Sequence, residues 1–311
     1  MNALAHKTEP RALWAASITV VIWSSAYAAI TYGLRSFTPG ELTFLRFAVA
    51  SLVFAVPVAT GYIKLPPRQD WLALAGLALI GHVGYQLCLM YSMTRISAGA
   101  AAVAIAMVPS VTAVIAVLRL HERLSLRAVI GLAIAFLGTL LVVIGRGHEI
   151  RFEPLALLVF VSVLCSSFYF VFQKPLLART TSLGFTAASM FVATLALTPF
   201  AMHLPAKLAQ VPAPQLVSAL YLGLLPTVVG FLLWSWALAR APASKVTSFI
   251  NLGPVSGIAI AYFWVDEIPG WLTLVGGTLA ILGVVLATAQ PDGWLARLWT
   301  RRPVPAPEAC G

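Results

Sequence analysis

Two short segments of the chain share a pattern of hydroxyl-bearing and aromatic residues. The pattern Ser-Ser-x-Tyr occurs at residues 24–27 and again at residues 166–169, an offset of 142 positions. Serine hydroxyls donate and accept hydrogen bonds and aromatic rings form apolar walls, so such residues suit a small molecule with a polar head and an apolar body. The alternative is that the serines bond back to their own helix and the tyrosines fill space. The residues that would form the floor of a central binding cavity are Ser24, Ser25, Tyr27, Ser166 and Tyr169.

A second polar group lies in the middle of a long apolar stretch, residues 71–93. His82 is near its midpoint, and Tyr85 and Gln86 follow by three and four residues, which places all three on one face of a helix. His82 is either a neutral, hydrogen-bonded side chain or a residue that couples to protons, because imidazole titrates near neutral pH. Trp234 and Asn251, in two later apolar stretches, are expected to add walls to the same cavity.

The composition of the chain indicates whether these residues lie in a soluble protein or in a membrane protein. Hydrophobic residues make up 60% of the 311 positions and charged residues only 10%, whereas a soluble domain carries about 25% charged residues. The core of a soluble protein cannot bury this much apolar surface, so we expect much of that surface to contact the lipid bilayer. Ten apolar runs are each close to the roughly 20 residues with which a helix crosses a bilayer. They are approximately 12–33, 41–60, 71–93, 98–118, 126–145, 154–174, 183–202, 214–238, 246–264 and 270–288.

This pattern predicts an all-α integral membrane protein with ten transmembrane helices. Residues 1–11 form a polar lead. Residues 289–311, which are rich in arginine and proline, are expected to form a disordered tail.

Several other classes of protein are disfavoured. The net charge is +10, but the basic residues are spread through short loops and are not clustered with aromatic residues, which argues against nucleic acid. The three cysteines have neither metal-site nor disulfide spacing, so no metal ion or other cofactor is expected. HExxH, Walker and G-x-S-x-G motifs are absent from the sequence, so we do not expect an enzyme.

The chain contains an internal repeat. Residues 95–141 align without a gap on residues 240–286, an offset of 145 positions. Shared glycine, proline and glutamate at fixed spacing inside apolar sequence indicate a duplicated unit. We therefore predict two five-helix units, residues 12–145 and residues 154–288. The matched pairs are Pro109 with Pro254, Glu122 with Glu267, Gly131 with Gly276, and Gly138 with Gly283.

The basic residues predict the orientation of the chain. With the N-terminus inside, the inner loops and ends hold fourteen Lys and Arg and the outer loops hold five. This positive-inside bias predicts both termini in the cytoplasm and an outward-facing loop at residues 146–153. Because each unit has five helices, an odd number, the second unit enters the membrane from the opposite side. Such an inverted-topology repeat is the architecture that secondary transporters use for alternating access.

Prolines and glycines within the runs are expected to shape the helices. Pro109, Pro254 and Pro226 each remove a backbone donor and should bend a helix, either for packing or as a hinge that lines a cavity. Small residues let membrane helices approach closely. Four glycines therefore predict close packing of the fifth and tenth helices, with a homodimer through them as one arrangement. They are Gly131, Gly138, Gly276 and Gly283.

Arg46 is a charged residue about two turns inside the second apolar run. A charge at the bilayer centre costs about 2.5–3.5 kcal/mol on insertion scales. Arg46 either anchors the helix by reaching towards the outer interface or binds a substrate carboxylate.

These residues also carry a family resemblance. The chain resembles the drug/metabolite transporter superfamily, in particular its EamA-type exporters, over about residues 12–288. One departure is Cys165, which stands where the first unit has Trp23. The features that match are Trp23-Ser24-Ser25, Pro39 followed by Arg46-Phe47, Pro109, and the string Glu122…Gly131…Gly138 with its repeat Glu267…Gly276…Gly283.

The resemblance implies a ten-helix exporter in the cell (inner or plasma) membrane, and it identifies the fold better than the substrate. We expect a secondary transporter that moves small metabolites by alternating access, with amino-acid export favoured. Carriers of drugs, purines or sugars share this fold and are the alternative. A non-transporting membrane scaffold or sensor is a further alternative, which the polar residues at mid-membrane disfavour because a scaffold has little use for them.

Overall fold

The computed structural model describes residues 10–120, 126–146, 149–150, 154–241, 246, 249–266 and 268–288. Almost all of these residues are helical. Glu122 and Glu267, the matched acidic pair of the internal repeat, lie outside the described residues.

Within the described residues, the first unit contains nine helical elements. They are α1 (Pro10–Gly33), α2 (Pro39–Ala59), η1 (Arg68–Asp70), α3 (Trp71–Ala78), η2 (Leu79–Gly84), α4 (Tyr85–Ser92), α5 (Ala98–Ile105), α6 (Val108–Leu120) and α7 (Leu126–Ile144). A short antiparallel pair, β1 (Gly145–Arg146) and β2 (Glu149–Ile150), follows α7.

The second unit has a similar order of elements. They are η3 (Pro154–Leu157), α8 (Leu158–Leu177), α9 (Ser182–Leu197), η4 (Thr198–Ala201), α10 (Leu204–Leu208), α11 (Ala213–Leu222), η5 (Gly223–Gly230), α12 (Phe231–Arg240), η6 (Phe249–Leu252), α14 (Gly253–Val265) and α15 (Trp271–Thr288).

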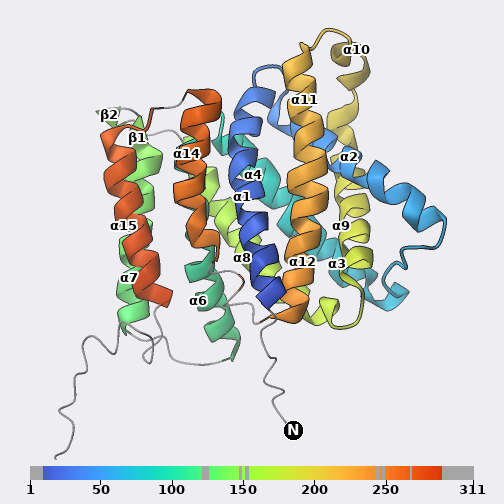
Figure 1. The fold of residues 1–311 in the computed structure, drawn as a ribbon, viewed down its shortest axis with the longest axis horizontal. Coiled ribbons are helices and arrows are strands. Elements are labelled where there is room, and N and C mark those ends of the chain that lie inside the picture. The colour runs from blue at the N-terminus through green and yellow to red at the C-terminus, as the bar shows by residue number, and fades with distance from the viewer. Residues whose placement is uncertain are drawn as a thin grey trace, which may run out of the picture.

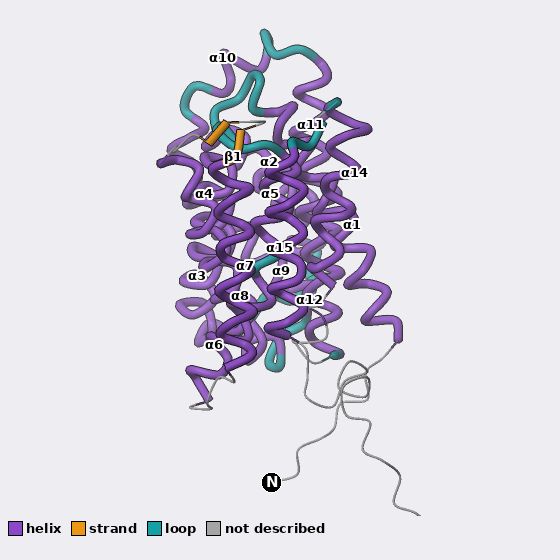
Figure 2. Tube along the Cα trace, turned by 90° about the vertical axis from the view of Figure 1, so that its left-hand side faces the viewer, coloured by secondary structure: helices purple, strands orange, loops and turns teal. Residues whose placement is uncertain are grey.

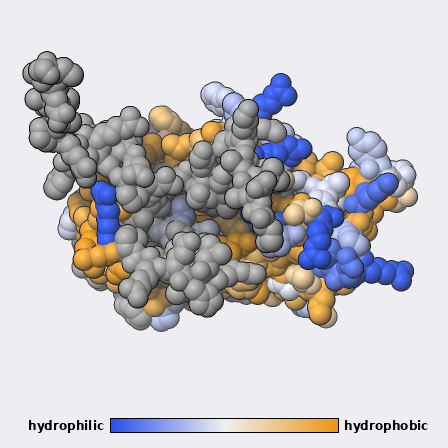
Figure 3. Space-filling model, turned by 90° about the horizontal axis from the view of Figure 1, so that it is seen from below, coloured by the Kyte–Doolittle hydropathy of each residue, from blue (hydrophilic) through white to orange (hydrophobic). Residues whose placement is uncertain are grey.

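Apolar helices occur at all ten predicted runs, but they differ in length. Within the described residues, six helices are long and apolar enough to cross a membrane. The helices at the fourth, fifth, ninth and tenth runs are apolar but shorter. The helices run between two ends of the molecule, and the loops gather at those ends (Figure 2). Hydrophilic side chains gather on the end where α1 begins, and hydrophobic ones are visible around its edge (Figure 3).

The two units run in opposite directions. In Figure 1, α1 begins at the lower end of the molecule, whereas α8 begins near the upper end, which carries β1, β2 and α10. This arrangement agrees with the inverted repeat that the odd number of runs predicts.

The fourth and ninth runs are interrupted, not merely bent. Helix α5 ends at Ile105 and α6 begins at Val108, so Pro109 is the second residue of a new helix. Pro254 is likewise the second residue of α14. Proline fits the first turn of a helix because its missing N–H has no partner there in any case. Each break therefore comes before its proline, whereas the sequence predicts a bend at the proline itself.

Helices α7 and α15 pack side by side at one edge of the bundle (Figure 1). A Cβ atom added at Gly138 would lie 2.5 Å from the backbone nitrogen of Ala280 and 2.6 Å from the carbonyl oxygen of Gly276. Gly283 similarly lies against the backbone of Gly131 and Ala135. The glycine faces of the two helices are thus used within one chain, and a homodimer through these helices would have to use their other faces.

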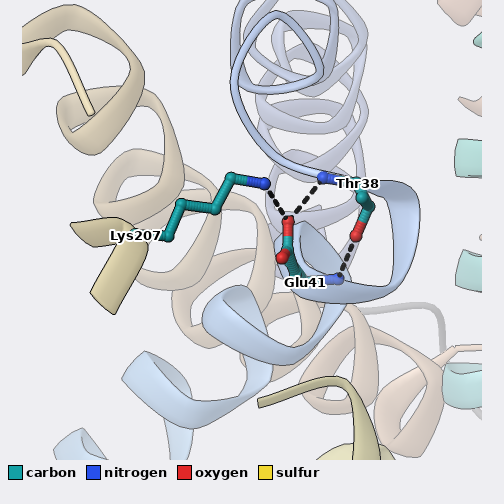
Figure 4. Close-up of polar contacts among 3 residues, drawn as sticks. All are labelled: Thr38, Glu41 and Lys207. Carbon is teal, nitrogen blue, oxygen red and sulfur yellow. Dashed lines mark hydrogen bonds and ion pairs between the residues drawn. The ribbon is translucent and has the colours of Figure 1, made fainter. Parts of the chain in front are cut away.

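The beginning of α2 is held by a capping box and an ion pair (Figure 4). The backbone N–H of Thr38 donates to Oε2 of Glu41 over 2.8 Å, and the N–H of Glu41 donates to the Thr38 hydroxyl. Lys207 of α10 donates to the same carboxylate oxygen over 2.7 Å. One carboxylate therefore caps α2 and ties it to the second unit.

Candidate functional site

Two π-helical segments, η2 and η5, occupy corresponding places in the two units. They end at Gly84 and Gly230, and an aromatic residue follows each glycine, Tyr85 and Phe231. Such segments are rare and occur frequently at functional sites. Within η5, the carbonyl of Pro226 accepts a hydrogen bond of 2.9 Å from Nε1 of Trp23.

The side chains near these segments enclose a central cavity between the two units. Its free space is about 50 Å³, enough for a few water molecules. Both units contribute matched residues to its walls. These are Ser24 and Ser166, Tyr27 and Tyr169, and Tyr85 and Phe231. Other residues of the wall include Trp23, Arg46, Gly81, Gln86, Leu89, Ile105, Phe170, Ile250 and Gly253.

An aromatic cluster forms one side of the cavity. The ring of Trp23 is parallel to that of Phe170 at 6.3 Å and lies 5.2 Å from that of Phe231. Trp234 packs behind them, 4.9 Å from Trp23, and is fully buried. The cluster gives the cavity a rigid apolar wall.

His82 lies outside the cavity and contacts one of its walls. Its side chain is fully buried, and Nε2 lies 3.3 Å from the hydroxyl oxygen of Tyr169. Rings of Phe47, Tyr169 and Phe231 surround it at centroid distances of 5.6, 4.9 and 4.6 Å. The histidine is thus placed to fix the orientation of Tyr169.

The serines of the two Ser-Ser-x-Tyr segments separate into two groups. Ser24 lines the cavity and shares a 2.7 Å hydrogen bond with the hydroxyl of Ser256. Ser25 faces away from it, towards the hydroxyl of Tyr221 at 2.6 Å. Ser166 lines the cavity and donates to the carbonyl of Val163. Successive residues of a helix point in different directions, so only one serine of each pair reaches the cavity.

Six of the ten residues suggested from the sequence line this cavity. They are Ser24, Tyr27, Tyr85, Gln86, Ser166 and Tyr169. Ser25, His82 and Trp234 lie outside the wall, and nothing is described of the Asn251 side chain. Phe231 was missed, although it follows Gly230 as Tyr85 follows Gly84.

Arg46 is part of the cavity wall and is buried in the protein. Only 3% of its surface is exposed, and Nε donates to the hydroxyl of Thr227 over 2.8 Å. Thr227 belongs to η5, so this bond joins the second helix of the first unit to the π segment of the second. A charged group is thereby brought to a cavity that is otherwise neutral along its described wall.

Comparison with known proteins agrees with this architecture. The sequence profile of the EamA-like transporter family matches residues 10–144 and 154–289. A probable terminal-alkyne amino-acid exporter of Streptantibioticus cattleyicolor is 33% identical over 283 residues, covering 91% of this chain and 95% of that protein. A probable amino-acid metabolite efflux pump of Escherichia coli is 23% identical over 285 residues, covering 87% and 92%.

A solved crystal structure has the same fold, with a TM-score of 0.64 over 93% of this chain and 98% of the other, at 20% identity. The family profile matches both units, and the exporter from Streptantibioticus cattleyicolor matches along nearly the whole chain. This chain is therefore a multi-pass membrane transporter that belongs to the EamA-like transporter family.

Proposed function

We propose that this transporter exports amino acids or similarly small, partly apolar metabolites across the cell membrane by alternating access. The observation that carries the proposal is the central cavity, to which the two units contribute matched hydroxyl and aromatic residues. In transporters built from inverted repeats, substrates bind near the bilayer midplane between the repeats. The names of the two relatives, an amino-acid exporter and an amino-acid metabolite efflux pump, support amino acids as the class of cargo.

The test is counterflow in proteoliposomes that contain the purified protein. Labelled amino acids, purines and sugars are offered to vesicles loaded with the same unlabelled compound. Accumulation of an apolar amino acid above that in protein-free vesicles is the expected result. Accumulation of only a purine, sugar or drug would replace amino-acid export with the alternative cargo. A lack of flux with every compound would favour a scaffold or sensor.

The proposal includes ten membrane crossings with both termini in the cytoplasm. The fourteen-to-five distribution of basic residues supports this orientation. In a variant without native cysteines, a cysteine placed at Gly147 should react with an impermeant thiol reagent in intact cells. A cysteine placed at Thr60, in the loop after α2, should be protected. The reverse pattern would contradict the proposed orientation.

A further inference from the structure

We propose that Arg46 binds the carboxylate of the transported molecule, so that the cargo is an apolar carboxylate such as an amino acid with an apolar side chain. This inference rests on the proposed role of the central cavity and specifies which chemistry that cavity selects.

The first argument is that Arg46 has no compensating charge. The guanidinium is almost fully buried, and among the described residues no carboxylate lies within ion-pair distance of it. The described carboxylates that do form ion pairs are at other places, Asp70 with Arg179 and Glu41 with Lys207. A buried charge without a partner is costly, and an anionic ligand removes that cost.

The second argument is the orientation of the guanidinium. The hydroxyl of Thr227 donates over 2.7 Å to the carbonyl of Leu222, five positions earlier and the last residue of α11. Its oxygen is thereby placed to accept from Nε of Arg46. The guanidinium makes no other hydrogen bond within the described part of the chain, so its two Nη groups remain for a ligand. A guanidinium fixed in this way matches the two oxygens of a carboxylate.

The third argument is the remainder of the wall. Tyr27, Tyr169, Phe170 and Phe231 line the same cavity and provide apolar surface for a side chain. Gln86 also lines it with 1% of its surface exposed, and its Nε2 has no described hydrogen-bond partner. An amide in this position can donate to the carboxylate or, with its oxygen, accept from an ammonium group. The set of groups suits a carboxylate attached to an apolar body.

The first experiment uses the unmodified protein and pairs of ligands. L-leucine, L-phenylalanine and L-propargylglycine are each compared with their carboxamides, by binding to purified protein and by counterflow. The proposal expects at least one amino acid to bind about 10-fold to 100-fold more tightly than its carboxamide, the range for losing hydrogen bonds to a charged group. Equal binding within every pair that binds would overturn it. Flux of a neutral sugar or purine alone would also overturn it, while leaving the transport proposal in place.

The second experiment uses variants. Arg46→Gln should weaken binding of the amino acid about 10-fold or more. The affinity of this variant for the carboxamide should equal that of the unmodified protein. Arg46→Lys, which keeps the charge but not the planar fork, should lie between the two. Arg35→Gln removes an exposed charge outside the cavity and serves as the matched control. If Arg46→Gln loses affinity for both ligands equally, Arg46 supports only the fold. If this variant does not fold, the ligand pairs decide alone.

Discussion

The two units use corresponding positions for different chemistry. Gly230 lies against Trp23 of α1, and Gly84 lies against Cys165 of α8, so each π segment packs on the first helix of the other unit. Trp23 donates a hydrogen bond to the carbonyl of Pro226 in η5. A cysteine thiol at the matched position offers only a weak donor. The contact is repeated, although it is tighter at Gly230 than at Gly84, whereas the strong hydrogen bond is found in one unit.

The second helix of each unit shows the same contrast. Arg46 follows the N-cap Thr38 of α2 by eight residues, and Ser189 follows the N-cap Thr181 of α9 by eight. Repeated glycines and caps therefore preserve the scaffold, while the charged group that faces the cavity occurs once. A duplicated fold can in this way keep two similar halves for movement and still bind an asymmetric molecule.

The largest effect is expected from breaking what the two units share, the contact of α7 with α15. Gly138→Val should reduce the yield of monodisperse protein and lower its thermal midpoint strongly, because the added atoms would meet the backbone of Ala280 and Gly276. Overpacking usually costs about 1–3 kcal/mol and more where the backbone cannot move. Gly76→Val in α3 is the control, since a Cβ there meets nothing within 4 Å. Equal stability of the two variants would contradict the packing argument.

The next effect tests whether both units contribute to binding. Tyr27→Ala and Tyr169→Ala should each weaken substrate binding, by about 10-fold or more, because a buried aromatic side chain contributes about 1.5–3 kcal/mol. Calorimetric titration of the folded variants with the amino acid found by counterflow measures this loss. Tyr262→Ala, at a half-exposed position outside the cavity, is the control. Unchanged affinity in both cavity variants would exclude this site.

The scaffold was more predictable from the sequence than the site. Proline and glycine punctuation and the 20-residue runs located the helices, because in lipid every backbone group must be satisfied within the segment. Pro109 and Pro226 indicated irregular helix near the break in the fourth run and in η5, but nothing in the sequence placed that break at Ala106–Met107 or predicted the π geometry of η2 and η5. The direction of Arg46 was equally open, because its partner Thr227 is 181 positions away.

A further prediction separates the two roles that the sequence allows for His82. The structure favours positioning, since His82 contacts Tyr169 and does not line the cavity. His82→Ala should lower the transport rate and leave the shape of its pH profile between about pH 5.5 and 7.5 unchanged. The rate at several pH values in proteoliposomes measures both properties. A flattened profile would instead identify His82 as the proton-coupling residue.

A smaller effect sharpens the contrast between Trp23 and Cys165. Trp23→Phe keeps an aromatic ring but removes the donor to Pro226, so it should reduce stability by about 1 kcal/mol. Trp234→Phe is a matched control, because Nε1 of this buried residue has no described hydrogen-bond partner. Thermal unfolding of the two variants in the same detergent compares them. If Trp23→Phe is as stable as the unmodified protein, the hydrogen bond to η5 does not contribute to the fold.

The smallest effect concerns the two ends of the molecule. Glu41 follows its N-cap by three residues and pairs with Lys207, whereas Gly184, three residues after Thr181, packs against the carbonyl of Lys64. An ion pair therefore ties the units at the end that carries α10, and a close backbone contact ties them at the other.

A double-mutant cycle measures what this ion pair contributes. Glu41→Gln keeps an oxygen that can cap Thr38, so this variant and Lys207→Met remove mainly the charge interaction. Because a third of the Lys207 side chain is exposed, solvent screens the pair, and its coupling energy should lie below about 1 kcal/mol. The coupling should shrink further in high salt, since screening acts on exposed charges. A coupling of zero in low salt would mean that the ion pair with Lys207 contributes nothing and that the capping box alone holds the start of α2.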